Sequence, residues 1–356
     1  MVTDEQKINS KFWLLIPAFC LAFSATAVEI SRAFKLQRYH RVKAFATASL
    51  WRSALARASF PASVESHSFS FSSAAASPII ELIRSEVERI SKQRGGRLSV
   101  RVCVLGSGSR GNAAWVATEK TRLLIDVGLS RREIFSRLTA IGERPETCTA
   151  ILISHEHTDH ISGLPRVALE LKCPLFLTPA TREALPSKLE IKSCEFFTAG
   201  EKFAVGDIEI SPFSIPHDAA DPVAFTLEAE GIKIGLVTDL GYIPELVKQR
   251  VRGCNALIFE SNHDLEMLKI GPYPWQVKQR VMSRQGHLSN LTTAEFLSGE
   301  YDGGAQVLVL AHLSETNNHP EIARLSALEA LARRPRETRT EVHLASQSAP
   351  TGIFRW

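Results

Sequence analysis

The segment ISHEHTDHISGLP, from Ile153 to Pro165, places three histidines and two acidic residues within the six positions 155–160. No other stretch of the sequence is as dense in metal-ligand side chains. The run TAILIS before it (149–154) predicts a short buried strand, and the spacing of apolar residues predicts a helix over 161–172. The cluster therefore lies at the end of a strand, where the backbone is free to bring several side chains together.

The order of residues within this cluster predicts which side chains converge. In an extended segment, residues two apart project to the same side, so we expect His155, His157 and Asp159 to point together, while a chain turn at His160 adds a fourth ligand. A helical zinc-protease motif needs a histidine four residues after His155, and that position holds Asp159. Imidazoles with a carboxylate suit zinc, and these four ligands are more than one open catalytic zinc uses. The pattern predicts a pair of metal ions.

Three later apolar runs each end in a further metal-ligand residue. IEISPFSIPH ends at His217, GIKIGLVTD ends at Asp239, and AQVLVLAH ends at His312. We expect His217 to complete the coordination of one metal and Asp239 to bridge the two.

Three other residues near predicted strand ends have two interpretations each. Asp126 ends the strand LLID and precedes a helical pattern over 130–141, so it either caps that helix or is oriented toward the metals. Glu260 and His263 follow the strand ALIFE, where they either fix the orientation of a ligand imidazole or belong to a surface loop.

The loop GSGSRGN contains Gly106, Gly108 and Gly111 in the G-x-G-x-x-G spacing of dinucleotide-binding loops. That fingerprint requires a helix that opens at the last glycine. Here the apolar runs AAWVAT and TRLLIDVG follow, and they predict two strands. The loop is therefore interpreted as a tight connection between strands.

Charge is unevenly distributed along the 356 residues. Positions 1–98 hold 14 Lys and Arg against 7 Asp and Glu, a net charge of +7, whereas 99–356 hold 28 against 31, a net charge of −3. Because the second segment is slightly acidic, binding to nucleic acid requires a local basic patch. The six cysteines have no C-x-x-C spacing and suggest a reducing compartment, so a cytoplasmic location is expected.

The sequence predicts an N-terminal extension over 1–98 and one domain over 99–356. Residues 12–28 form an apolar run that resembles a signal peptide or a short membrane anchor. A membrane is expected as a partner only if this run is an anchor. Residues 31–78 are rich in Ala, Ser and Arg, which suits an unpacked transit peptide or a start codon assigned too far upstream. A short linker helix is predicted over 79–93.

The segment GPYPWQVKQRVMSRQGHLSN (271–290) mixes aromatic and basic side chains and runs into His287. Such a mixture predicts contact with single-stranded nucleic acid, and an amphipathic helix with a solvated charged face is the alternative. The candidate substrate-binding residues are Tyr273, Trp275, Lys278, Arg280 and Arg284.

The motif SHEHTDHISG and the ligand types at later strand ends resemble the metallo-β-lactamase-fold hydrolase superfamily over about 98–356. This resemblance implies an α/β fold, an αββα sandwich of two mixed β-sheets flanked by helices, with two divalent metal ions, Zn2+ or Mn2+, at one edge. It implies that one metal is held by His155, His157 and His217, the other by Asp159, His160 and His312, with Asp239 as the bridge. His312 is preferred to His287 as the last ligand because the run before it, VLVLA, is the clearer strand.

Six segments are also similar to the YycJ (WalJ) family of exonucleases: LGSGSRGN, LLIDVGLS, SIPHDAADP, FESNHD, GPYPWQVKQRVMSRQGHLSN and LAHLSETNN. This similarity implies a metal-dependent phosphodiester hydrolase, a 5′-to-3′ exonuclease that uses a hydroxide activated by two metals. DNA is expected as the partner in preference to RNA, with a role in repair, and no partner protein is implied. Asp159 is expected to orient the hydroxide. His287 is expected to protonate the leaving 3′ oxygen, by similarity to the tRNA-processing nucleases of the superfamily.

Other functions remain as alternatives at this stage. The same metals could hydrolyse a small ester, a thioester or a lactam, which suits an acidic domain. A di-iron oxidoreductase is disfavoured because that branch replaces the second histidine of the motif with Glu, whereas His157 is present here. A binding protein without activity is disfavoured because none of the expected ligands is missing.

Overall fold

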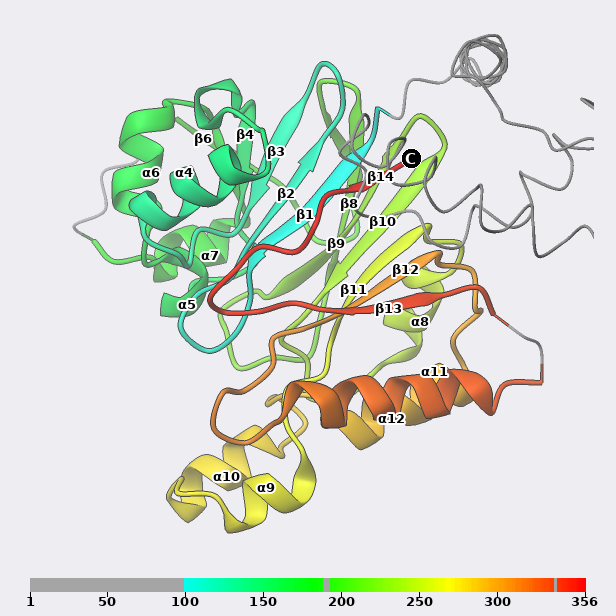
Figure 1. Ribbon diagram of the computed structural model, residues 1–356. Helices are drawn as coiled ribbons and strands as arrows, with labels where there is room; N and C mark the ends of the chain where they lie inside the picture. The colour runs from blue at the N-terminus through cyan, green and yellow to red at the C-terminus, as the bar shows by residue number, and fades with distance from the viewer. Residues whose placement is uncertain (1–98, 188–192, 336–337) are drawn as a thin grey trace, which may run out of the picture. The chain divides into compact units, whose positions relative to one another are not determined.

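The computed structural model describes residues 99–187, 193–335 and 338–356. The predictions for the extension, including its segments 12–28, 31–78 and 79–93, lie outside these residues. Within them, two seven-stranded β-sheets are flanked by helices (Figure 1). The αββα sandwich expected from the sequence is confirmed.

The first sheet has the strand order β14-β1-β2-β3-β4-β5-β6. Its strands are β1 (Arg101–Gly106), β2 (Ala113–Ala117), β3 (Arg122–Ile125), β4 (Ala150–Leu152), β5 (Leu175–Leu177), β6 (Cys194–Phe196) and β14 (Phe354–Arg355). The strands from β14 to β3 pair antiparallel, and those from β3 to β6 pair parallel. Its helices are α4 (Arg131–Ala140), α5 (Thr158–Ile161), α6 (Leu164–Leu171) and α7 (Pro179–Ala184), with the short 3-10 helix η1 (Pro145–Thr147).

The second sheet has the order β13-β12-β11-β10-β9-β8-β7. Its strands are β7 (Phe203–Val205), β8 (Ile208–Ser214), β9 (Val223–Ala229), β10 (Ile232–Val237), β11 (Ala256–Glu260), β12 (Val307–Ala311) and β13 (Glu341–Leu344). The strands from β7 to β10 pair antiparallel, and those from β10 to β13 pair parallel. Its helices are α8 (Glu245–Val251), α9 (Leu265–Ile270), α10 (Trp275–Val281), α11 (Asn290–Gly299) and α12 (Pro320–Ala332).

The strands alternate between two apolar layers, as β1 illustrates. Val102 and Val104 point into the core between the two sheets, whereas Cys103 and Leu105 pack with the residues under α4 and α6. A third core joins the outer face of the second sheet to α8, α11 and α12. Each fully buried aliphatic side chain contributes about 1.5–3 kcal/mol to such cores. Burial on both faces explains why these strands are continuously apolar in the sequence.

The predicted helix over 130–141 is confirmed as α4, which begins with a capping box between Ser130 and Glu133. The helix predicted over 161–172 is confirmed as α6, but it begins at Leu164, because the short helix α5 ends at Ile161 and the chain breaks at Gly163. A Cβ on Gly163 would lie 1.9 Å from the Leu129 carbonyl oxygen, so this close approach of two backbones requires glycine.

The interpretation of the glycine-rich loop is also confirmed. After Gly106 the chain turns and enters β2, which pairs antiparallel with β1. No helix follows Gly111 directly, so the dinucleotide fingerprint is not formed.

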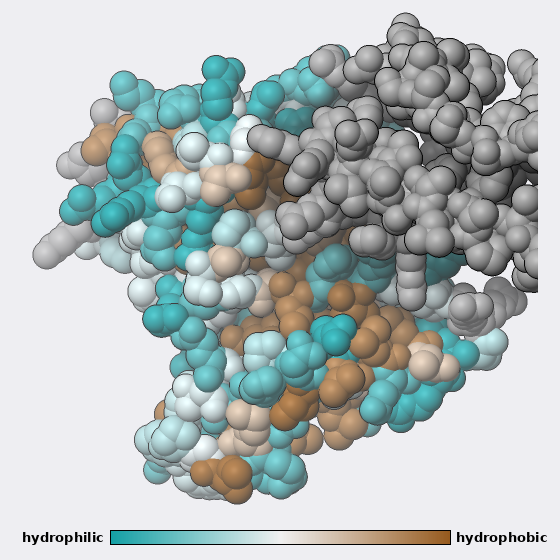
Figure 2. All heavy atoms as spheres, in the orientation of Figure 1, coloured by the Kyte–Doolittle hydropathy of each residue, from teal (hydrophilic) through white to brown (hydrophobic). Residues whose placement is uncertain are grey.

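Hydrophobic residues gather in the lower half of the view in Figure 2, over β13 and α12, while the helices of the first sheet are covered mainly by hydrophilic ones. On α12, Ile322, Leu325 and Leu328 are exposed. Among the residues that the structure describes, no helix combines the length and the apolar character that a membrane span needs.

Candidate metal centre

The ends of parallel strands from both sheets meet where the candidate ligands lie. Asp126 follows β3 directly, His312 follows β12 directly, and Asp239 lies two residues after β10. All three adopt a left-handed backbone conformation, with φ values of 58°, 56° and 64° respectively. Asp and His are among the residue types that tolerate this conformation, which nevertheless carries strain. The strained turns redirect these side chains at the point where each strand ends.

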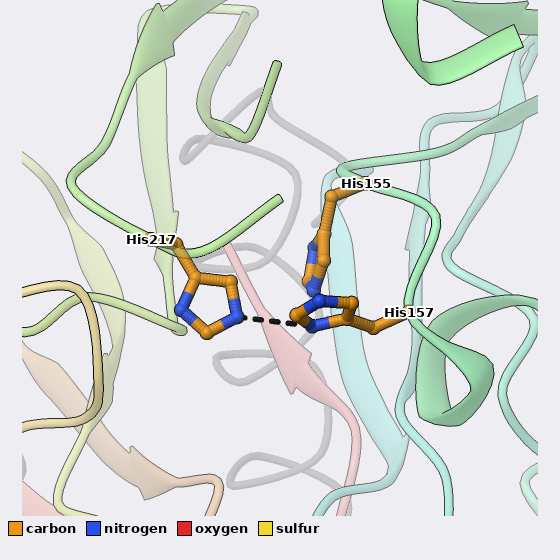
Figure 3. Close-up of side chains that lie close together, drawn as sticks. All are labelled: His155, His157 and His217. Atoms are coloured by element: carbon orange, nitrogen blue, oxygen red, sulfur yellow. Dashed lines mark hydrogen bonds between the residues drawn. The ribbon is translucent and has the colours of Figure 1, made fainter. Parts of the chain in front are cut away.

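His155, His157 and His217 form the first group, here named the His-only cluster (Figure 3). One ring nitrogen from each lies within 4.8 Å of the others. His217 Nε2 is 3.1 Å from His157 Nδ1. His155, three residues after the end of β4, points toward this pair. The three imidazoles are arranged to hold one metal ion.

Asp159, His160, Asp239 and His312 form the second group, here named the mixed cluster, again with ligand atoms within 4.8 Å. Asp159 Oδ2 lies 3.4 Å from His160 Nε2 and 3.3 Å from His312 Nε2. Asp239 lies between the two clusters, since its carboxylate is 3.4 Å from His160 Nε2 and 4.0 Å from His217 Nε2. This is the placement that a bridging ligand needs.

The convergence predicted within the HEHTDH motif is partly wrong. His155 and His157 are extended and point together, but α5 begins at Thr158, so Asp159 lies in its first turn beside His160. Asp159 therefore belongs to the mixed cluster rather than to the side of His155 and His157.

A buried carboxylate fixes imidazoles on each side of the site. Asp126 Oδ2 lies 2.8 Å from His160 Nδ1 and accepts a hydrogen bond from Ser154 Oγ, which in turn is 2.9 Å from His155 Nδ1. Asp126 thus contacts one cluster directly and the other through Ser154. Partners of this kind set which ring nitrogen is left for a metal.

Glu260, the last residue of β11, has the same function on the other side. Its Oε1 is 2.9 Å from His312 Nδ1 and 2.9 Å from His287 Nδ1, and its Oε2 accepts the backbone N–H groups of Leu240 and Leu288. Burial opposes its ionisation, but the two imidazoles lower the pKa of Glu260 to about 2. The carboxylate is therefore ionised and holds each Nδ1 proton.

Burial and charge act differently on the imidazoles of the two clusters. In the His-only cluster, removal from water lowers the pKa of His155 and His217. In the mixed cluster, burial also opposes the charged form, but Asp239 and the neighbouring carboxylates raise the pKa of His160 and His312 well above its usual range.

Two buried polar atoms support metal binding on independent grounds. His155 Nε2 and Asp239 Oδ2 have no hydrogen-bond partner within the described part of the chain. A buried polar atom without a partner is costly, and both atoms face the clusters. Imidazole and carboxylate are ligand types for divalent metals, so the residues present fit such ions. The site therefore has the donors for two divalent metals.

His287 and His312, between which the sequence left a choice, differ in position. His312 is buried, with 3% of its side chain exposed, and its Nε2 approaches Asp159. His287 is 21% exposed and is grouped with Glu260 and His312 rather than with Asp159. This geometry favours His312 as the ligand and leaves His287 at the solvent side.

The residues predicted to contact nucleic acid do not all lie where such contact requires. Lys278 is the exception: it is buried and its Nζ donates to the Lys269 carbonyl oxygen at 2.7 Å, so its charge faces the protein. Trp275 is 59% exposed, and Arg280 is exposed while paired with Asp218.

The remaining candidates lie close to this surface or behind it. The Arg284 guanidinium stacks on Tyr242 at 4.1 Å, and Tyr273 is half-buried. His263 is buried, and desolvation lowers its pKa to about 4. No contact between His263 and a candidate ligand is present in residues 99–187, 193–335 and 338–356, so its expected function as a partner of an imidazole is not supported.

Sequence reasoning missed Ser154 and Asn112. Asn112 Nδ2 lies 3.0 Å from Asp159 Oδ2 and 3.1 Å from His160 Nε2. The one signal for each was a polar residue bordering a strand that is otherwise apolar, Ser154 after TAILI and Asn112 before AAWVA.

Comparison with known proteins agrees with this geometry. The beta-lactamase superfamily domain matches residues 121–313. Exodeoxyribonuclease YycJ of Bacillus anthracis is 35% identical over 237 residues, which cover 66% of this chain and 90% of YycJ. Exodeoxyribonuclease WalJ of Streptococcus pneumoniae is 35% identical over 240 residues, covering 66% of this chain and 89% of WalJ. The metallo-beta-lactamase fold protein YhfI from Bacillus subtilis superposes with a TM-score of 0.56 at 18% identity, covering 72% of this chain and 100% of YhfI.

Proposed function

This chain belongs to the beta-lactamase superfamily and, within it, to the family of the exodeoxyribonucleases YycJ and WalJ, and from that premise we propose that it is a metal-dependent 5′-to-3′ DNA exonuclease. The observation that carries the proposal is the pair of ligand clusters that share Asp239 at one sheet edge. Two metals held by these clusters would supply the chemistry that phosphodiester hydrolysis needs.

The metals, when bound, would supply an activated water and stabilise charge on the phosphate oxygens. Zn2+ is the metal that the histidine-rich donor set fits best, and Mn2+ is the alternative. The protein's own contribution begins with Asp159. Its side chain is 23% exposed, whereas Asp239 is 3% exposed, so Asp159 is the carboxylate of the mixed cluster that solvent can reach. We assign it the orientation of the attacking water.

His287 is assigned the transfer of a proton to the leaving 3′ oxygen. Glu260 holds the Nδ1 proton at 2.9 Å, so Nε2 is the nitrogen left for the leaving group. As an imidazolium, His287 would donate its Nε2 proton to the 3′ oxygen and keep the Nδ1 proton that Glu260 binds. The neighbouring Gly286 carbonyl oxygen lies 3.3 Å from His217 Nδ1, which ties this segment to the His-only cluster. His287 is therefore supported beside the metals without being one of their ligands.

The segment before His287 offers a surface for the nucleic acid strand. Trp275 supplies an exposed ring for base stacking, and the same segment carries two exposed cations, Arg280 and Arg284. Arg280 is paired with Asp218, which adjoins His217, so the positive charge lies next to the site. DNA is the preferred substrate because both relatives are named exodeoxyribonucleases. We place this activity in the cytoplasm, in the processing of DNA ends during repair.

The proposal is tested with the full chain, loaded with Zn2+ or with Mn2+, on duplexes and single strands of DNA and RNA labelled at either end. Stepwise loss of nucleotides from the 5′ end of DNA, absent in Asp159→Ala, is the expected result. Digestion that prefers RNA, or that starts from the 3′ end, would correct the substrate or the polarity. No digestion by a chain that binds two metals would contradict the nuclease function, and hydrolysis of small esters or thioesters would then be tested.

A further inference from the structure

The loop 107–112, which carries the glycine-rich motif, lies against the mixed cluster although none of its residues is a candidate ligand. Ser107 and Asn112 are both buried. The Asn112 backbone N–H donates to the Asp159 carbonyl oxygen at 2.7 Å, and the Gly128 N–H donates to the Asn112 carbonyl oxygen at 2.8 Å. A Cβ on Gly128 would lie 1.6 Å from the Asp159 carbonyl oxygen, so glycine is required for this approach. The loop is thus fixed beside Asp159 by its backbone.

The Asn112 carboxamide has a partner in every hydrogen-bonding direction. Its Oδ1 accepts from Ser107 Oγ at 2.9 Å and from Gly108 N at 3.0 Å. Its Nδ2 donates to the Gly108 carbonyl oxygen at 3.1 Å and to Asp159 Oδ2 at 3.0 Å. Because Gly108 N can only donate and the Asp159 carboxylate can only accept, the orientation of the amide is determined.

Ser107 extends this connection to the second sheet. Its Oγ accepts the His312 backbone N–H at 2.8 Å and donates to Asn112 Oδ1. Asp159 Oδ2 also lies 3.3 Å from His312 Nε2. A closed ring of hydrogen bonds therefore joins Asp159, Asn112, Ser107 and His312. It holds two ligands of one metal that come from different sheets.

We propose that Asn112 is a positioning residue that holds the Asp159 carboxylate toward the metal of the mixed cluster and, through Ser107, sets its distance from His312. The Asn112 amide acts on that site through candidate ligands, since its Nδ2 donates to Asp159 Oδ2 at 3.0 Å and lies 3.1 Å from His160 Nε2. The expected effect of Asn112 on DNA digestion rests on the proposed function. Its expected effect on metal affinity is independent of that function.

The test measures metal per chain and metal affinity in the full-length protein, with zinc alone as the probe and a chromophoric chelator as competitor. In Asn112→Asp, a carboxylate of the same shape faces Asp159, and repulsion replaces a hydrogen bond. We expect bound zinc to fall from two per chain to one and the affinity of the mixed cluster to fall about 10- to 100-fold. The His-only cluster is expected to keep its zinc. With DNA, kcat should fall while KM changes little.

Asn290→Asp is the matched control. Asn290 is equally buried, and its amide is bonded to Ser261 and Asn318, away from the clusters. Asn112→Ala and Ser107→Ala complete the set. Asn112→Ala removes the bond to Asp159 without adding charge. Ser107→Ala removes the bonds of Ser107 Oγ to the His312 N–H and to Asn112 Oδ1 but leaves the bond from Asn112 to Asp159. We expect the loss of affinity to decrease in the order Asn112→Asp, Asn112→Ala, Ser107→Ala.

Thermal unfolding of the metal-free variants separates positioning from stability. If Asn112→Asp fails to fold, Asn112→Ala carries the test. Wild-type affinity for two zinc ions in Asn112→Ala would overturn the proposal, as would an equal loss of metal in Asn290→Asp. A wild-type chain that holds fewer than two zinc ions would overturn it as well. A wild-type chain that binds two zinc ions but digests no nucleic acid would contradict the nuclease function while leaving the comparison of zinc affinities decisive.

Discussion

The His-only cluster and the mixed cluster meet at Asp239 but differ in the ionisation of their side chains without metal. Desolvation lowers the pKa of His155 and His217, so these imidazoles are neutral and ready to bind. Carboxylates raise the pKa of His160 and His312, so these imidazoles carry protons that a metal must displace. The His-only cluster therefore offers two buried neutral donors, His155 and His217, whereas the mixed cluster is a set of internal ion pairs.

This difference suggests separate functions for the two halves. The buried, neutral imidazoles of His155 and His217 suit firm retention of one metal, with His157, whose side chain is 27% exposed, as the third donor. The mixed cluster contains Asp159, which is partly exposed, and His312, whose ring centroid lies 5.0 Å from that of the solvent-accessible His287. We infer that the chemistry depends most on the mixed cluster, and the following predictions address that inference.

The largest effect is expected for Asp159→Ala. One acid–base group typically contributes about 10²- to 10⁴-fold to the rate. Because Asp159→Ala removes both a ligand and the group that orients water, the rate of DNA digestion should fall by about 10⁴-fold or more. The His-only cluster should keep its metal. Metal analysis of the purified variant distinguishes the two functions of Asp159: full retention of two metals would mean that it orients water without being an essential ligand, and digestion at the wild-type rate would contradict both.

The next effect separates His287 from His312. His287→Ala should lower kcat about 10²- to 10⁴-fold while both metals remain bound, because only a proton donor is lost. His312→Ala should release the metal of the mixed cluster. Rates and metal content measured on the same preparations check this. Loss of metal in His287→Ala with retention in His312→Ala would reverse the two assignments.

Acidification should weaken the mixed cluster more than the His-only cluster. The raised pKa of His160 and His312 means that both imidazoles still hold a proton near neutral pH, which the metal must displace. Each proton displaced lowers the metal affinity about tenfold for every pH unit of acidification. The lowered pKa of His155 and His217 means that these two imidazoles need no such displacement until lower pH. Zinc competition between pH 6 and 8, with calorimetry in two buffers to count released protons, measures the difference. Equal pH dependence of the two affinities would remove the distinction.

The smallest effect is expected for Trp275→Ala, which lies outside both clusters. Loss of one exposed stacking ring should cost about 1 kcal/mol, or roughly fivefold in KM for DNA, with kcat and metal content unchanged. Leu325→Ala on α12 is the control, since Leu325 is also exposed but lies on another helix. An equal change in both variants would show that the surface around α10 does not bind the substrate.

The resemblance to the metallo-β-lactamase fold predicted the sandwich, and the apolar runs that end in His217, Asp239 and His312 predicted residues that the structure brings together. Interactions between distant segments could not be predicted in the same way. The break at Gly163 depends on the Leu129 carbonyl oxygen. Strand alternation placed Asp159 with His155 and His157, whereas the family resemblance grouped it with His160 and His312, where the start of α5 at Thr158 puts it.

Single polar residues were the other limit. Lys278 was expected to face nucleic acid, but its Nζ reaches the Lys269 carbonyl oxygen because α9 and α10 pack together. Asn112 and Ser154 act on ligands from positions that carry no metal-ligand signal of their own. Their contacts to Asp159 and His155 appear only once the sheets are assembled.

The claim that the two clusters form one catalytic site is tested most directly by titrating zinc into the metal-free full-length chain while DNA digestion is followed. We predict that the first equivalent binds with little activity and that digestion appears with the second, as the mixed cluster fills. Full activity after one equivalent, with no change on adding the second, would contradict a two-metal site.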